Sequence, residues 1–363
     1  MEKVCEKYFM GSMSADGFRS DFKSEIDSDG VFTYILKGGA GTGKSTLMKK
    51  VAAAFEDRCE VVRYYCSSDP DSIDAVFVKQ AGVIVVDGTA PHTFDPQYPA
   101  VKQTIVNLGD SWDSKKLKEN TASIISATDS HRRLMNRAKS YVGAMSRLYD
   151  DTIYMAGDEL DVKKLEAAVA RLCVKIMPKK NKEGSVRMSL VGAVTPKGYM
   201  LQKDTLSGFD RIYVIDDDLF AVSDMLQKLV CENAVKRGYN VTVSRCGLFT
   251  QSVYELVMIK ELGVAFVAST PINLFAQSSD KVVKINGMRF YDVAGIRLKK
   301  RRLKANRNAC SKLLEECVTT LSQAKAMHDE IEKYYISAMD FSLVDKSTRK
   351  IISEIRKRLV DGV

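Results

Sequence analysis

The run Gly38-Gly39-Ala40-Gly41-Thr42-Gly43-Lys44-Ser45-Thr46 decides the fold of this chain of 363 residues. It fits the pattern G-x-x-x-x-G-K-[ST] at every fixed position. Glycines let the backbone bend so that successive N–H groups converge, and converging N–H groups attract the oxygens of a polyphosphate. The run therefore predicts a nucleotide-binding loop, with residues 38–46 as the binding segment.

Both flanks of this run have the pattern that such a loop needs. The residues before it, 31–36, are mostly β-branched or aromatic, which is typical of a strand. After it, Leu47, Val51 and Phe55 recur at a helical interval. The sequence thus predicts a strand, a loop and a helix in this order, and the helix N-terminus adds its dipole to the anion site.

Three residues carry the metal and phosphate chemistry of the predicted site. Lys44 is expected to bind the β and γ phosphates, and Ser45 to offer its hydroxyl to Mg²⁺. The metal also needs a carboxylate at the end of a buried strand. The continuous apolar run from Gly82 ends in Asp87, so Asp87 is the expected second ligand.

Further catalytic candidates lie in two loops. Asp69 and Asp71 follow an expected strand at residues 60–66, although Asp-Pro-Asp is equally common in turns and helix caps. His92 and Asp95 follow Asp87 and could position a water, although both fit ordinary loop residues as well. The identity of the catalytic base therefore stays open.

A second copy of the whole pattern follows after about 180 residues, a period typical of a repeated domain. The matched groups are Gly11 and Gly17 with Gly192 and Gly198, residues 34–36 with 213–215, Cys66 with Cys246, residues 82–86 with 263–267, and Thr89 with Thr270. Each copy continues into a helical stretch with an apolar stripe: Leu134, Ala138, Tyr141, Met145 and Leu148 in the first, and Cys310, Leu314, Cys317, Leu321, Ala324, His328, Ile331 and Tyr335 in the second.

The second copy keeps the apolar positions and loses the polar ones. Residues 216–224 stand where the loop is expected, and they begin with three carboxylates, lack glycine and have Ser223 in place of Lys44. Carboxylates at a phosphate site are electrostatically unfavourable. The remaining replacements are Asp87 by Ala268, His92 by Asn273, Asp95 by Ala276, Asp69 by Phe249 and Asp71 by Gln251. Only the first copy is therefore expected to bind a nucleotide, although drift at surface loops would erase the same residues.

These patterns predict two tandem α/β domains of the P-loop NTPase type, each a parallel sheet flanked by helices and followed by a helical segment. The expected boundaries are 1–178 for the first domain, 179–187 for a linker and 188–363 for the degenerate second domain. The runs 36–50, 66–72 and 87–92 make the chain similar to a poorly characterised group of bacterial P-loop ATPase-like proteins. The resemblance covers nearly the full length and implies an ATPase. Members of that group often carry an intact phosphate loop in each half, and here only one is intact.

Three functional classes follow from this site. The first is a Mg²⁺-dependent ATPase coupled to a partner protein, in which Arg211, Arg245 or another subunit supplies an arginine finger. The second is a kinase for a small molecule or nucleotide, with Asp69 or Asp71 as the base. The third is a nucleotide-binding switch or scaffold without significant turnover, which the missing base favours.

Composition limits the partners. No apolar run reaches membrane-spanning length, the N-terminal residues do not resemble a signal peptide, and eight Cys without paired C-x-x-C spacing favour a reducing cytoplasm. The net charge of +9 raises the question of nucleic acid, and basic residues cluster at 297–307 and 349–358. Both runs lack interleaved aromatic residues, so a solvated helix face is favoured, as it is for His131, Arg132 and Arg133. A homo-oligomer stays open.

Overall fold

The chain forms two compact units in a computed structural model that describes residues 6–90, 93–275 and 279–361. The first unit contains residues 6–11, 20–138 and 318–361 of the described part. The second unit contains residues 12–19 and 139–317. Two long helices, α4 (Thr121–Gly157) and α7 (Val293–Ser337), each contribute residues to both units.

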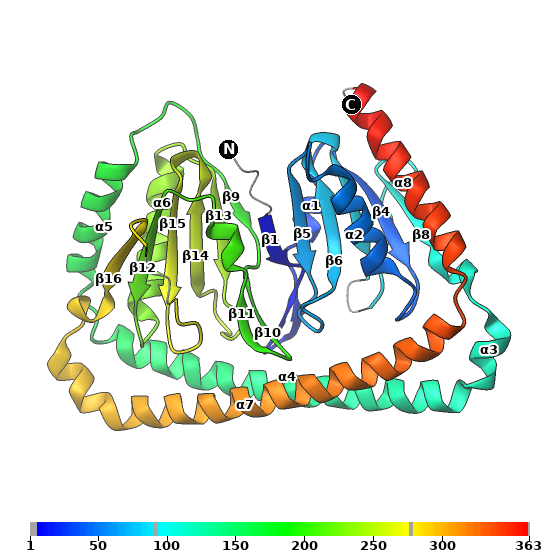
Figure 1. Ribbon diagram of the computed structural model, residues 1–363. Coiled ribbons are helices and arrows are strands. Elements are labelled where there is room, and N and C mark those ends of the chain that lie inside the picture. The colour runs from blue at the N-terminus through cyan, green and yellow to red at the C-terminus, as the bar shows by residue number, and fades with distance from the viewer. Residues whose placement is uncertain (1–5, 91–92, 276–278, 362–363) are drawn as a thin grey trace. The chain divides into compact units, whose positions relative to one another are not determined.

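The first unit is built on a mixed sheet of six strands, shown in blue and cyan in Figure 1. Its spatial order is β1-β5-β6-β7-β4-β8. Only β6 runs antiparallel to its neighbours. The strands are β1 (Glu6–Phe9), β4 (Phe32–Lys37), β5 (Val61–Tyr65), β6 (Ile73–Val78), β7 (Val83–Asp87) and β8 (Gln103–Asn107).

The expectation of a parallel sheet is therefore wrong at β6. The backbone N–H of Cys66 donates to the carbonyl of Ser72 at 3.1 Å, which closes a tight return of the chain after β5. A short connection of this kind joins antiparallel strands, whereas parallel strands need a crossover. The turn residues between Cys66 and Ser72 thus set the direction of the next strand.

Helix α2 (Lys44–Phe55) begins directly after the loop that follows β4 and packs against the sheet of the first unit. Leu47, Val51 and Phe55 are buried, so the predicted helical periodicity is confirmed. Helix α8 (Phe341–Asp361) lies beside α2 and adds Val344, Ile351 and Ile355 to the same core. The smaller helices of this unit are α1 (Lys23–Ile26) and α3 (Ser114–Glu119).

The second unit repeats this architecture (Figure 1, green and yellow). Its six-stranded sheet has the order β16-β12-β15-β14-β13-β9, with only β14 antiparallel to its neighbours. Two hairpins, β2–β3 and β10–β11, also belong to this unit. The elements are β2 (Ser12–Ser14), β3 (Gly17–Arg19), α5 (Val162–Ile176), β9 (Val186–Met188), β10 (Gly192–Thr195), β11 (Gly198–Leu201), β12 (Arg211–Asp216), α6 (Ala221–Lys236), β13 (Val241–Arg245), β14 (Tyr254–Ile259), β15 (Val264–Ser269) and β16 (Val282–Asn286).

Matched positions of the two copies have matched conformations. Gly82 and Gly263 both end a short 3₁₀ helix before the central strand, with φ of 58° and 60°. Gly17 and Gly198 turn the two hairpins with φ of 125° and 108°. All four φ values lie where a Cβ is unfavourable, which explains why glycine recurs at each position.

The division into units differs from the expected boundary at residues 179–187. Helix α5 precedes that segment, yet its apolar side, Leu165, Val169 and Cys173, packs in the core of the second unit. Helix α8 comes last in the chain, yet it packs in the first unit. The segment after α5 also packs on the second unit, where the Lys180 N–H donates to the Arg237 carbonyl at 2.9 Å.

Candidate functional site

The glycine loop, residues 38–46, connects β4 to the first turn of α2. Gly41 and Gly43 have φ of 69° and 84°, and Gly43 is the N-cap of α2. The Thr42 hydroxyl donates to the Gly39 carbonyl at 2.9 Å, which closes the loop on itself. The backbone N–H groups at this helix N-terminus are therefore held in an arrangement suited to an anion.

Lys44 lies at the centre of the site. Its Nζ donates to the carbonyl oxygens of Gly38 at 2.8 Å and Gly39 at 2.7 Å, and it lies 3.6 Å from Asp87 Oδ2. The two side chains are only 10% and 15% exposed. An incoming phosphate would meet a lysine that is already positioned, and it would replace carbonyl contacts with charged ones.

Asp87 is brought to the loop by strand pairing. Strands β4 and β7 are parallel neighbours, and Leu36, near the end of β4, is in register with Asp87. Asp87 Oδ1 accepts from the Thr89 N–H at 2.8 Å and from the Thr89 hydroxyl at 2.5 Å. Thr89 thus fixes the carboxylate in one orientation and leaves Oδ2 directed to Lys44.

The surroundings of Asp87 suit a cation. Burial raises the pKa of Asp87 above its ordinary value, and Lys44 only partly offsets this effect. Ser45 Oγ accepts from the Ile73 N–H at 3.1 Å, so this hydroxyl also has a fixed place beside the loop. A hydroxyl and a carboxylate are oxygen ligands of the type that Mg²⁺ prefers.

The remaining predicted residues have partners of their own. Asp69 Oδ2 accepts from the Ser72 hydroxyl at 2.7 Å, and Lys325 of α7 lies 3.5 Å from Oδ1. Asp95 is 84% exposed and lies 3.4 Å from the Lys37 amine. The Asp71 carbonyl accepts from Lys49 at 2.6 Å. His92 lies outside the described residues.

Sequence reasoning missed the part of α7 that covers the glycine loop. Glu332 Oε1 accepts from the Gly41 N–H at 3.3 Å. A Cβ at Gly41 would lie 2.8 Å from the Glu332 carbonyl oxygen, and one at Gly39 would lie 3.3 Å from the Tyr335 ring. Only glycine therefore fits under this helix at position 41. Glu332 is almost 300 residues from the loop and matches no motif, so no sequence signal identifies it.

Asp74 was also missed, although a lone acid in the apolar run 73–78 is a visible signal. It is buried, and its charge contributes to the raised pKa of Asp87. The second unit has Glu255 at the same place, one residue into β14. Because the acid persists in the copy without a glycine loop, its presence alone does not indicate nucleotide binding.

Helix α6 of the second unit begins two residues earlier than the matching α2, and the counterpart of the glycine loop is filled by a side chain of the chain itself. Ser223 is the structural match of Lys44, because the next residues, Ser45 and Asp224, accept from the corresponding N–H groups of Ile73 and Tyr254. Phe220 is the N-cap of α6 with φ of 67°, at the place where Gly41 of the first unit has φ of 69°. Ser223 therefore stands in the place of Lys44, as the sequence predicts.

Asp217 takes the place of an anion in that counterpart. Its carboxylate accepts from the Ser223 N–H at 2.8 Å, the Leu219 N–H at 3.1 Å and the Tyr291 hydroxyl at 3.0 Å. The side chain is 1% exposed. The N–H groups that would meet a phosphate are thus already satisfied.

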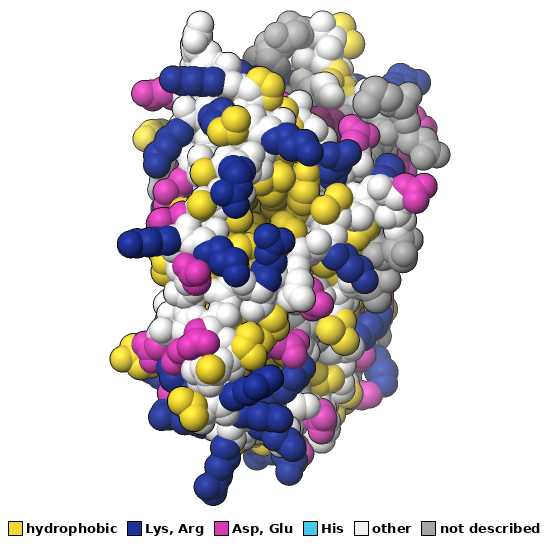
Figure 2. Space-filling model, turned by 90° about the vertical axis from the view of Figure 1, so that its left-hand side faces the viewer, with side chains coloured by type: hydrophobic (Ala, Val, Ile, Leu, Met, Phe, Trp, Pro, Cys, Tyr) yellow, Lys and Arg dark blue, Asp and Glu magenta, His cyan; other side chains and the backbone are white. Residues whose placement is uncertain are grey.

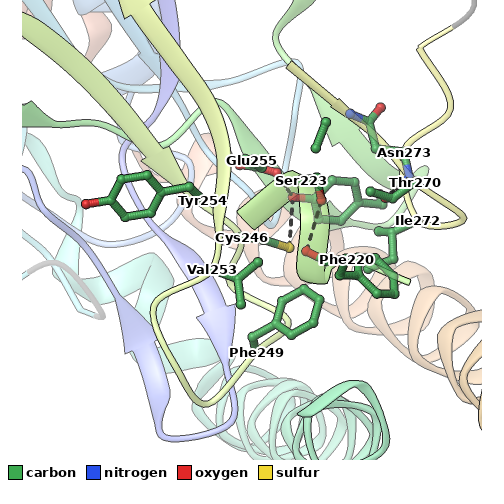
Figure 3. Close-up of a pocket in the computed structure, with 12 residues that line it drawn as sticks. Phe220, Ser223, Cys246, Phe249, Val253, Tyr254, Glu255, Thr270, Ile272 and Asn273 are labelled. Carbon is green, nitrogen blue, oxygen red and sulfur yellow. Dashed lines mark hydrogen bonds between the residues drawn. The ribbon is translucent and has the colours of Figure 1, made fainter. Parts of the chain in front are cut away.

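A small cavity lies beside the same counterpart loop (Figure 3). Its lining includes Phe220, Phe249, Val253 and Ala268. Ala268 is the structural match of Asp87, because it pairs with Ile215 of β12 as Asp87 pairs with Leu36 of β4. Burial raises the pKa of Glu255, which also lines the cavity. Ser223 and Ala268, which both line this cavity, therefore stand where the first unit has its charged pair.

A second candidate cation site lies on α7. The ligand atoms of His328, Asp329 and Glu332 lie within 4.8 Å of one another. Asp329 is paired with Lys325 at 2.9 Å, and Glu332 is bound to the Gly41 N–H. Both carboxylates would have to give up these partners, so Ser45 and Asp87 are the better candidate ligands.

Comparisons with protein-family models, with curated proteins and with solved structures found no match to this chain. Among the described residues, no helix has the length and apolar character needed to cross a membrane. The chain is a mixed α/β protein with two six-stranded mixed sheets flanked by helices. Its function must be argued from the site itself.

Proposed function

We propose that the first unit is a P-loop NTPase unit that binds Mg·ATP at the glycine loop and hydrolyses it at this single site. The observation that carries the proposal is the placement of the Lys44 amine, with the buried Asp87 carboxylate 3.6 Å away, at the N-terminus of α2. A cation, an acid and a helix N-terminus held together in this way match the needs of a metal-bound polyphosphate.

Each residue has a defined task in this proposal. The loop N–H groups and Lys44 hold the phosphates and stabilise the charge that develops as the terminal phosphoryl group leaves. Ser45 and Asp87 hold the magnesium ion, and Thr89 keeps Asp87 in its orientation. When bound, the metal neutralises phosphate charge and orients the phosphate oxygens.

The second unit supports a single site. Asp217 accepts from N–H groups of its loop, and Ala268 and Ser223 stand at the places of Asp87 and Lys44. A nucleotide there would have to displace a buried carboxylate and would find neither the lysine nor the metal ligand. We therefore expect one nucleotide per chain.

Phosphate release from Mg·ATP tests this proposal, with nucleotide binding measured in parallel. We expect Lys44→Ala to lower the rate by about 100-fold, the usual effect of removing one donor to the transition state. Lys50→Ala is the matched control, because Lys50 is on the same helix and half exposed, and it pairs with the exposed Asp345 at 2.6 Å. Equal rates for the two variants would refute the proposed site.

A nucleotide-binding switch with little turnover is the second candidate, and one observation favours it. Of the predicted carboxylates other than Asp87, Asp69 contacts Ser72 and Lys325, and Asp95 is largely exposed. These contacts identify no general base at the loop among the residues that the structure describes. Binding of one Mg·ATP without phosphate release would establish this alternative.

A further inference from the structure

The first turns of α7 carry an unusual density of positive charge. Between Lys281 and Arg307 the sequence has ten Lys or Arg and one acidic residue, Asp292. This excess equals the net charge of +9 of the whole chain. The segment includes β16 and the part of α7 that belongs to the second unit.

Four of these cations form one stripe. Arg297, Lys300, Arg301 and Lys304 follow the spacing i, i+3, i+4 and i+7, which places them on one face of a helix. All four are exposed, and none makes an ion pair with any residue that the structure describes. On a solvated helix face with paired charges, these four cations would have acidic partners at i+3 or i+4.

The acidic residues nearby are already neutralised. Lys299 lies 2.8 Å from both Asp158 and Glu159, and Arg302 lies 2.6 Å from Asp151. These pairs join α7 to the end of α4 and leave the four-residue stripe free. An approaching polyanion therefore meets positive charge that is not cancelled by its surroundings.

An aromatic side chain lies in the groove beside the stripe. Tyr154 of α4 is 73% exposed, and it lines an open groove together with Leu298, Arg301 and Arg302. Residues 297–307 contain no aromatic residue, and the fold supplies one from a segment about 150 residues earlier. Exposed aromatic rings beside cations are the elements that bind unpaired bases and their phosphates.

The surface is open to a partner. Figure 2 shows the side of the molecule that carries α5, β16 and the start of α7, and Lys and Arg side chains gather at its lower end. Figure 1 places the first turns of α7 at this position. From Arg297 to Lys304 the helix rises about 10 Å, which is enough to contact successive phosphates of one strand.

We propose that the stripe Arg297, Lys300, Arg301 and Lys304, together with Tyr154, binds single-stranded nucleic acid. The cations contact the phosphates, and the tyrosine ring stacks on a base. This surface lies in the second unit, so it does not depend on the nucleotide site proposed for the first unit.

Fluorescence anisotropy with a labelled single strand of about 16 nucleotides tests this proposal. Between about 50 and 200 mM salt, replacing all four stripe residues by Ala should reduce the slope of log K against log[salt] by about 3, since each phosphate contact contributes about 0.7. Tyr154→Ala should weaken binding by about tenfold and leave the slope unchanged.

The matched control removes the same charge elsewhere. Lys346, Arg349, Arg356 and Lys357 of α8 are also exposed, and their replacement by Ala should leave the slope as in the wild type. Equal losses in both variants would show that only net charge matters and would overturn the proposal. Tighter binding of a duplex than of the single strand would overturn the proposal as well. So would binding of anionic vesicles or polyglutamate that depends on the stripe, if the single strand does not bind.

Discussion

Glu332 should compete with nucleotide for the glycine loop, and its removal should tighten binding. Its Oε1 atom accepts from the Gly41 N–H at 3.3 Å, and this N–H belongs to the group that faces the phosphates in the proposed site. One N–H cannot serve both acceptors fully. A nucleotide must therefore displace Glu332 before it gains this contact, and it must also approach a negative charge.

The magnitude follows from the geometry of this contact. A hydrogen bond to a charged group contributes about 1.5 to 3 kcal/mol when it is short and dry. This one is long, and the Glu332 side chain is 36% exposed, so about 1 kcal/mol is the better value. Glu332→Ala should then lower the Kd for Mg·ATP by about fivefold. Glu332→Gln keeps an acceptor without the charge and should have a smaller effect.

The protein contains its own reporter for this measurement. Trp112 is the single tryptophan of the chain, and its ring lies 3.6 Å from the Cβ position of Gly39. Titration of Mg·ATP followed by Trp112 fluorescence should therefore give the Kd of each variant. Glu330→Ala is the control, because Glu330 lies on the same helix and pairs with the exposed Lys333. A Kd for Glu332→Ala equal to or above that of Glu330→Ala would refute the reasoning.

Two further substitutions test the site and the core. Burial raises the pKa of Asp87 in the folded protein above its ordinary value of 3.8. Between the ordinary and the raised pKa, the folded state binds more protons than the unfolded state. The free energy of unfolding therefore falls as the pH rises through this range. Asp87→Asn should therefore raise the Tm of the nucleotide-free protein at neutral pH while abolishing phosphate release; a lower Tm would contradict this account. Ile355 of α8 is fully buried in the core of the first unit. Ile355→Ala should reduce the free energy of unfolding, measured by urea titration, by about 2 to 5 kcal/mol. A reduction below about 1 kcal/mol would mean that α8 is not part of that core.

The elements around the glycine loop could be predicted because local chemistry determines them. The expected strands at 31–36, 60–66 and 82–87 are found within one residue as β4, β5 and β7. The loop residues, the helix after them and the register that brings Asp87 to the loop all follow from short runs of sequence. The same holds for the repeat, since matched glycines have matched backbone angles.

The contributions of distant helices could not be predicted. Helices α5 and α8 both present an apolar stripe, and a stripe does not specify which of two similar cores it covers. The pairing of α5 with the second unit and of α8 with the first is decided by packing between side chains far apart in sequence. For the same reason, Glu332 over the loop and Tyr154 beside the basic stripe were invisible in the sequence.

The two units finally differ in how easily a carboxylate leaves the loop N–H groups. In the second unit Asp217 is part of the loop itself, is 1% exposed and accepts three hydrogen bonds, so displacing it would break the core around α6. In the first unit Glu332 comes from another helix, is 36% exposed and makes one long contact with the loop. A phosphate can therefore replace Glu332 at small cost, whereas it cannot replace Asp217 in this way. The nucleotide binding proposed for the first loop and its expected absence at the second thus depend on the same kind of interaction. In this proposal, binding at the first loop also alters the contact between that loop and α7.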